Sequence, residues 1–179
     1  MDGARFANAV AGSGVSPADL TWRAGVDMLS FGGTKNGCLA AEAVVFFNRD
    51  LVSDFEYRRK RGGHLWSKMR FMAAQFDAYL TNDLWLTLAS QANAMAQRLS
   101  QGLTALNEVE VCYPTEINEV FAAMPTAAAD AMREQGAAFY PWMMPGDWTD
   151  GRMNRFIASF RTTEEDVDEF LDLAKRTLG

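Results

Sequence analysis

The sequence has few of the residues that enzymes commonly use near neutral pH. His64 is its single histidine, so a catalyst of this size would have few general bases of its own. Cysteine is also scarce, since Cys38 and Cys112 are the only two and no CxxC spacing occurs. This scarcity argues against a disulfide framework and a structural zinc site, and it fits a reducing compartment. No metal site is predicted.

An excess of basic residues is missing as well. The chain carries 23 acidic and 17 basic residues, for a net charge of −6, which argues against general nucleic-acid binding. No apolar run is long enough to span a membrane, and the first residues lack the basic-then-apolar pattern of a signal peptide. We therefore expect a cytoplasmic protein with no membrane or nucleic-acid partner. With 49% hydrophobic and 22% charged residues, its composition is that of a folded globular chain.

A glycine-rich stretch around Lys35 is the most informative part of the sequence. An apolar run ends at Gly32 and Gly33, a polar turn contains Lys35, and a second apolar run covers residues 38–47. The pattern predicts a strand, a turn and a strand, with the lysine amine at the tip of the turn. Small uncharged neighbours suit a lysine that loses its proton and attacks a carbonyl. A solvated loop lysine is the alternative.

The remaining pattern predicts an α/β chain in three parts: residues 1–75, a connecting helix at 76–105, and a small α+β domain at 106–179. Helices are expected over residues 51–61, 66–80 and 83–102. The first part contains two expected strands, which are too few for a stable sheet. We therefore expect it to pair with another chain or with strands that this sequence lacks.

The last part is expected to contain four short strands with helices on one face. Turns are predicted at residues 145–147 and 150–151. Thr162 and Glu165 have the spacing of a capping box, which predicts that the final helix starts there.

Three segments, taken in order, resemble the second half of the threonine aldolases. They are Asp2-Gly3-Ala4-Arg5, the stretch Ser30-Phe31-Gly32-Gly33-Thr34-Lys35-Asn36-Gly37, and the basic segment from Arg58 to Arg70. These aldolases are pyridoxal phosphate (PLP) enzymes with the aspartate aminotransferase-like fold, called fold type I. The resemblance covers essentially all of this chain and about half of the family's usual length. It implies the C-terminal part of that fold, with a remnant of the large domain followed by a small C-terminal domain.

The resemblance also implies roles for residues in the first two segments. Lys35 would form the Schiff base with the cofactor aldehyde, and Asp2 would keep the ring nitrogen protonated. Arg5 would lie beside the phenolic oxygen of the cofactor and the substrate carboxylate. Many family members have Ser-Lys-Gly where this chain has Thr34-Lys35-Asn36-Gly37, which leaves open whether Thr34 contacts the phosphate.

The basic segment has three interpretations: a nucleic-acid patch, a solvated helix end, or an anchor for the cofactor phosphate across a dimer interface. For residues 58–61 the solvated helix end is favoured, because cations at a helix C-terminus are stabilised there. Lys68 is the predicted phosphate anchor by resemblance, with Arg70 second and His64 nearby.

Arg155, near the start of an alternating strand, matches the arginine that binds the substrate carboxylate in related enzymes. Two-point binding of a carboxylate suits a guanidinium. Arg152 and Arg161 are competitors for this role.

The implied activity is cleavage of L-threonine, L-allo-threonine and similar β-hydroxy-α-amino acids to glycine and an aldehyde, in a homo-oligomer such as a dimer or tetramer. The ring-stacking residue and phosphate loop of the family are not found in this sequence. We therefore expect the isolated chain to take up the cofactor without turnover. One alternative is a non-catalytic remnant with a structural or interaction role. Another is a different β-eliminating lyase of the same fold.

Overall fold

The computed structural model describes residues 1–143 and 149–178 and divides the chain into two compact units, Met1–Ala89 and Ser90–Gly179. The border between them falls within helix α4 (Leu84–Thr104). The finer three-part division expected from the sequence stays a prediction. None of the described helices has the length and apolar character needed to cross a membrane.

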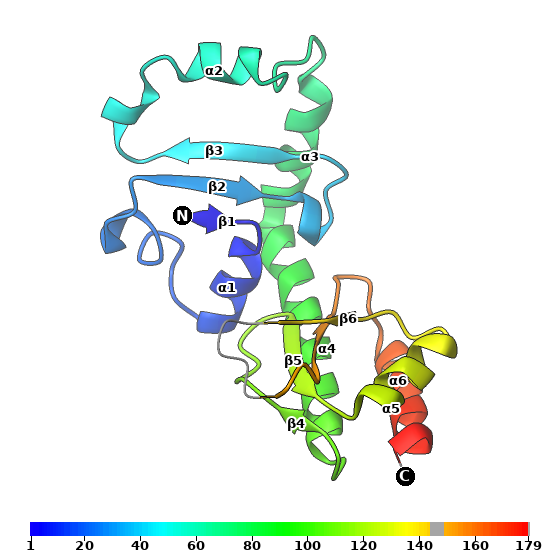
Figure 1. The fold of residues 1–179 in the computed structure, drawn as a ribbon. Coiled ribbons are helices and arrows are strands. Elements are labelled where there is room, and N and C mark those ends of the chain that lie inside the picture. The colour runs from blue at the N-terminus through cyan, green and yellow to red at the C-terminus, as the bar shows by residue number, and fades with distance from the viewer. Residues whose placement is uncertain (144–148, 179) are drawn as a thin grey trace. The chain divides into compact units, whose positions relative to one another are not determined.

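The first unit is built on a three-stranded sheet in the order β1-β2-β3, with β2 in the middle (Figure 1). Strand β1 runs parallel to β2, and β3 runs antiparallel to it. In chain order, the elements before α4 are β1 (Asp2–Gly3), α1 (Phe6–Ser13), η1 (Trp22–Ala24), β2 (Met28–Gly32), η2 (Thr34–Asn36), β3 (Glu42–Phe46), η3 (Arg49–Val52), α2 (Phe55–Arg61), α3 (Arg70–Leu80) and η4 (Thr81–Asp83).

The core of the first unit brings α1, β2, α3 and the start of α4 together. Phe31 on β2 contacts several rings, and its centroid lies 5.7 Å from that of Phe76 and 5.9 Å from that of Trp85. Aromatic pairs at these distances add to the gain from burying apolar area. The buried members of this core are Phe6, Ala7, Val10, Leu29, Tyr79, Trp85 and Ala89.

The structure corrects three sequence predictions in the first unit. It has three strands where two were expected, because Asp2 and Gly3 form β1. Helix α2 starts at Phe55 and α3 at Arg70, each later than predicted. The apolar residues in and just before α2 are mostly exposed, with Tyr57 76% and Leu51 49% exposed, although Phe55 is half-buried. Apolar periodicity alone could not tell a packed face from an exposed one here.

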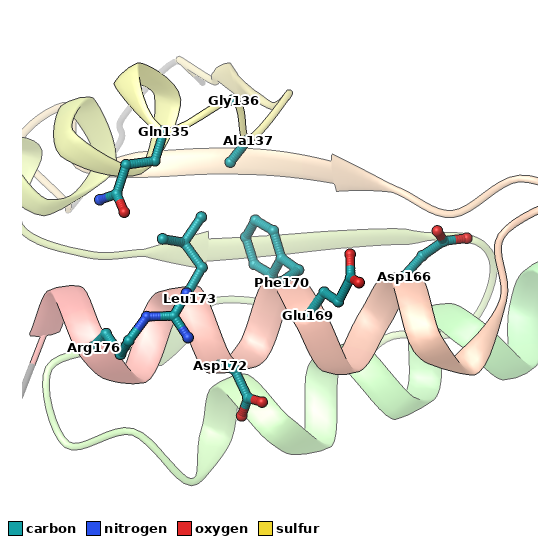
Figure 2. A pocket seen from close by; sticks show the side chains of 9 residues that line it. All are labelled: Gln135, Gly136, Ala137, Asp166, Glu169, Phe170, Asp172, Leu173 and Arg176. Atoms are coloured by element: carbon teal, nitrogen blue, oxygen red, sulfur yellow. The ribbon is translucent and has the colours of Figure 1, made fainter.

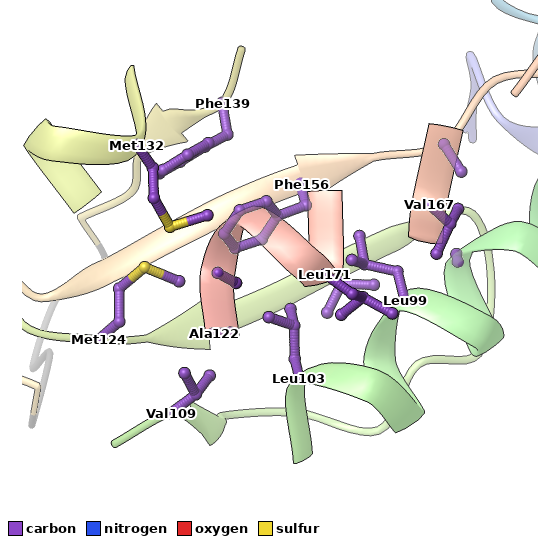
Figure 3. Close-up of a cluster of buried hydrophobic side chains, with 14 of the residues drawn as sticks. Leu99, Leu103, Val109, Ala122, Met124, Met132, Phe139, Phe156, Val167 and Leu171 are labelled. Carbon is purple, nitrogen blue, oxygen red and sulfur yellow. The ribbon is translucent and has the colours of Figure 1, made fainter. Parts of the chain in front are cut away.

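The second unit has an α+β fold with its own hydrophobic core. Its four strands form an antiparallel sheet in the order β4-β5-β7-β6, as the sequence predicted in number. The elements after α4 are β4 (Glu110–Val111), β5 (Glu119–Ala123), α5 (Thr126–Glu134), β6 (Tyr140–Pro141), β7 (Met153–Ile157) and α6 (Glu164–Leu178). Figure 3 shows side chains of α4, α5, α6 and the strands meeting in this core, including Leu103, Met124, Met132 and Phe156.

Two local predictions for the second unit have specific outcomes. The capping box of α6 is formed by Thr163 and Asp166, one residue later than predicted. The Thr163 N–H donates to Asp166 at 2.8 Å, and the Asp166 N–H donates to the Thr163 hydroxyl at 3.1 Å. The bond from the Thr163 N–H to the Asp166 carboxylate lowers the pKa of that carboxyl group. The expected turn at residues 145–147 lies outside the described residues.

Candidate active site

Lys35 lies in a tight turn that directly follows the central strand of the first unit. The Gly33 N–H donates to the Ala41 carbonyl at 2.9 Å, and the Cys38 N–H donates to the Gly33 carbonyl at 3.0 Å. A Cβ on Gly33 would lie 2.8 Å from the Cys38 Sγ and 2.9 Å from the Ala41 oxygen, so a larger residue would open the turn. The strand, turn and strand around Lys35 agree with the sequence prediction, and the Lys35 side chain is exposed.

The residue after the lysine anchors this turn to the helices behind it. The Asn36 amide is buried, with only 3% exposed, and it donates to the Tyr79 hydroxyl at 2.6 Å and to the Trp85 carbonyl at 2.8 Å. Each bond would cost free energy if broken, because it satisfies a buried polar group. Asn36 and Tyr79 were not singled out in the sequence as a pair. They are 43 positions apart and no local pattern links them.

The Asp2–Arg5 segment lies directly beside the strand that leads to Lys35. Asp2 is in register with Ser30 and Gly3 with Phe31, and the Gly3 N–H donates to the Ser30 hydroxyl at 3.3 Å. Farther along, a Cβ built on Gly32 would lie 3.2 Å from the Ala4 Cα. Two segments separated by more than 20 residues in the sequence are thus brought together by parallel pairing.

Within that segment, Asp2 and Arg5 are held differently. The Asp2 carboxylate is exposed and accepts one backbone bond, from the Ala4 N–H at 2.9 Å. Arg5 is half-buried at the start of α1, and its carbonyl accepts from the Ala9 N–H at 3.1 Å. The structure therefore places a carboxylate and a guanidinium on the element next to the lysine strand.

Most of the basic segment is exposed, although Arg59 and Met69 are half-buried. The Arg59 side chain donates to the His64 carbonyl at 3.2 Å, which closes the end of α2. The Arg70 guanidinium lies 4.7 Å from the Phe71 ring centroid. Lys68 is exposed just before α3. Its role as a phosphate anchor stays a prediction.

The predicted carboxylate-binding arginine lies in the second unit, on strand β7. Arg155 is in register with Phe121 on β5 and with Tyr140 on β6, near the centre of the sheet. Its competitors are placed differently. Arg152 donates to the Thr149 carbonyl at 3.0 Å, and Arg161 is an exposed residue after the strand.

Each unit also has a surface hollow. The one in the first unit adjoins the lysine turn and has a mostly apolar lining: Gly37, Cys38, Leu39, Gln75, Ala78, Tyr79, Leu84 and Leu88. Figure 2 shows the other, between α6 and the end of α5, lined by Gln135, Gly136, Ala137, Asp166, Glu169, Phe170, Asp172, Leu173 and Arg176. Neither lining includes a residue that the sequence predicts to bind the cofactor or the substrate.

At high pH, the free energy of unfolding is expected to depend on the protonation of the buried Tyr79 hydroxyl. Burial raises the pKa of Tyr79 to about 12 from 10.0, and the hydrogen bond from Asn36 opposes this shift. The folded state therefore holds the proton more tightly than the unfolded state. The stability that the protonated Tyr79 hydroxyl contributes is fully present below pH 10 and is lost as the pH rises towards 12.

Urea denaturation at several pH values between 8 and 12 tests this expectation. The free energy of unfolding should fall less steeply above pH 10 in Tyr79→Phe than in the parent chain. The Tyr140→Phe variant is the matched control, because that ring is 70% exposed. Equal slopes in the parent and in Tyr79→Phe would contradict the assignment.

The chain is similar along its whole length to known proteins. The chain is 46% identical over all 179 residues to the low specificity L-threonine aldolase of Pseudomonas aeruginosa, and covers 50% of that protein. It is also 46% identical over 169 residues to the protein of the same name from Pseudomonas sp., covering 47% of it. The chain thus spans about half the length of the curated relatives it matches.

The chain also resembles solved structures. A threonine aldolase from Leishmania major superposes with a TM-score of 0.87 at 26% identity, covering 99% of this chain and 51% of that one. A glutamate decarboxylase from Lactobacillus brevis, 13% identical with a TM-score of 0.74, shares the fold. The model of the family described as β-eliminating lyase matches residues 1–127. Because this match covers most of the chain, including the lysine turn and the Asp2–Arg5 segment, the chain belongs to the β-eliminating lyase family.

Proposed function

We propose that this chain is the lysine-bearing part of a PLP-dependent lyase that cleaves L-threonine and L-allo-threonine to glycine and an aldehyde. The observation that carries the proposal is the 46% identity to low specificity L-threonine aldolases along the full 179 residues. The pairing of the Asp2–Arg5 segment with the lysine strand supports it, because that pairing brings complementary chemical groups into one place.

The residues of the first unit fit the cofactor by the chemistry of their side chains. PLP has an aldehyde, a ring nitrogen and a phosphate, and bound to a protein it supplies an electron sink for the substrate. Lys35 offers an exposed amine for the aldehyde, and Asp2 offers a carboxylate for the protonated ring nitrogen. Gly33 has no room for a Cβ, and a Cβ on Gly32 would displace the Glu42 carboxylate, so glycine at both positions keeps the backbone beside the lysine bare.

The basic side chains would hold the anionic groups. Lys68 would attract the cofactor phosphate as a point charge. Arg5 and Arg155 would hold the substrate carboxylate, a task for which a guanidinium offers two parallel N–H donors. With the carboxylate fixed, the bond between Cα and Cβ can be oriented for cleavage.

We also propose a cytoplasmic homo-oligomer, dimeric or tetrameric. Cys38 and Cys112, both among the described residues, do not form a disulfide, as suits a reducing compartment. A partner copy would bring Lys68 to the phosphate in the way that the resemblance implies. Analytical ultracentrifugation of the purified chain tests the assembly, and a well-behaved monomer would count against it.

A chimera tests the activity. This chain would replace the matching half of the Pseudomonas aeruginosa relative, and release of glycine and acetaldehyde from L-threonine and L-allo-threonine would be measured. Turnover is expected with added PLP. A folded chimera that binds PLP without cleaving either isomer would favour a different β-eliminating lyase. A folded chimera that binds no PLP would favour the non-catalytic remnant.

A further inference from the structure

Arg155 is held mainly by contacts that do not use its N–H groups. Its guanidinium carbon lies over the Trp142 ring, 4.3 Å from the centroid. Cation–π stacking engages the face of the guanidinium, whereas its hydrogen-bond donors lie in the plane. Among the described residues, the buried Arg155 Nε has no hydrogen-bond acceptor. The Nε–H donor is therefore unpaired among these residues, while the stacking limits the orientations of the guanidinium.

A row of rings supports Trp142 on this face of the sheet. The Phe121 ring lies 5.8 Å from the Trp142 ring, centroid to centroid, and the Tyr113 ring lies 5.8 Å from that of Phe121. Phe121 is also in register with Arg155 across the β5–β7 pair, so both side chains are on the same face. Strand pairing thus fixes Phe121 in this row. Trp142 follows β6, its N–H donates to the Met153 carbonyl at 2.9 Å, and its ring is the one that meets the charge.

Glu119 is a resident carboxylate next to the same guanidinium. Its Oε1 lies 3.7 Å from Arg155 Nη1, and the side chains are 16% and 24% exposed. This distance is too long for a hydrogen bond, so the attraction is Coulombic. A second carboxylate arriving at Arg155 would be attracted by the guanidinium and repelled by Glu119.

We propose that Trp142 and Glu119 set the affinity of Arg155 for an amino-acid carboxylate in opposite directions. Trp142 is a positioning residue that holds the guanidinium ready for two-point binding. Glu119 is an internal competitor that keeps the site neutral until substrate arrives and weakens its hold on the carboxylate. This inference rests on the proposed function, which gives Arg155 the substrate carboxylate. It adds two residues that set how tightly the substrate is held and how readily glycine leaves.

The test is an NMR titration of the full chain labelled with ¹⁵N. Glycine is the probe, and glycinamide, which lacks the carboxylate, is the matched control. The Arg155 Nε–Hε resonance is identified by its loss in Arg155→Lys, while Arg152→Lys should leave it in place. A saturable shift of this resonance with glycine, and none with glycinamide, is expected in the parent chain.

The variants should move the apparent dissociation constant for glycine in opposite directions. Trp142→Ala is expected to raise it about three- to tenfold, and Trp142→Phe to restore part of the loss because a ring is retained. Glu119→Gln, of nearly the same shape, should lower it about three- to tenfold. Backbone amide spectra establish that each variant is folded.

A merely structural role for Trp142 and Glu119 would not give effects of opposite sign in folded variants. Equal affinity in the parent and in both Trp142→Ala and Glu119→Gln would overturn the proposal. So would a shift with glycinamide as large as that with glycine.

Failure of the proposed function is measured separately, by cofactor labelling of Lys35. If Lys35 is labelled while Arg155 does not respond to glycine, only this inference fails. If the reverse holds, the inference about Arg155 stands and the assignment of the lysine fails.

Discussion

Replacing Lys35 with arginine is expected to remove the PLP label that borohydride fixes on the purified chain. Arginine keeps the positive charge at position 35, but it stays protonated and cannot attack an aldehyde. The tight turn through Gly33 and the Asn36 anchor should stay intact, because the side chain of residue 35 is exposed. Peptide mapping after reduction should therefore find the label at position 35 in the parent and not in the variant. In the chimera, threonine cleavage should fall by about a thousandfold or more.

Other lysines provide the controls for this experiment. Lys175, on α6, forms an exposed ion pair with Asp172 at 3.1 Å, so Lys175→Arg should leave the label at Lys35 unchanged. Lys68→Arg keeps the charge proposed to attract the phosphate and should also retain the label. A label spread evenly over the lysines of the parent chain would show that the amine of Lys35 is not special. That outcome would favour the non-catalytic remnant.

The sequence predicted the lysine turn well because the relevant signals are local. Two apolar runs interrupted by adjacent glycines indicate a strand, a turn and a strand, and a Cβ on either glycine would clash with its surroundings. The same reasoning missed β1, because a strand of two residues has no periodicity to detect. Only the parallel pairing of Asp2 with Ser30 reveals that these segments are neighbours.

Other parts of the site depend on contacts between distant residues, which a single sequence does not encode in a readable form. The Asn36 amide meets Tyr79 and Trp85 across more than 40 positions. Trp142 reaches Arg155 from a neighbouring segment of the sheet. The α6 capping box was misplaced by one residue for a different reason: consecutive threonines, Thr162 and Thr163, both offer a hydroxyl, and the side-chain contacts decide between them.

Replacing Gly3 with alanine is expected to lower the free energy of unfolding by about 2–4 kcal/mol. This is a large effect for overpacking a core. A Cβ at this position would lie 2.5 Å from the Ser30 carbonyl oxygen and 2.5 Å from the Leu29 Cδ1. The leucine could change rotamer, but the carbonyl belongs to β2 and cannot move without disturbing the parallel pairing. Urea denaturation gives the free energy, and hydrogen exchange of the β2 amides shows whether the pairing has loosened.

Gly12→Ala is the matched control, because Gly12 is an exposed glycine inside helix α1. Alanine there should be neutral or stabilise the fold by up to about 1 kcal/mol. An equal effect of the two variants would contradict the packing argument for Gly3.

The Gly3→Ala variant also tests whether the pairing of β1 with β2 supports the reaction at Lys35. Since β1 holds Asp2 beside the strand that leads to Lys35, loosening it should weaken the cofactor label on a lysine that has not itself been changed. Retention of full labelling in a destabilised Gly3→Ala chain would mean that Lys35 reacts without the neighbouring carboxylate.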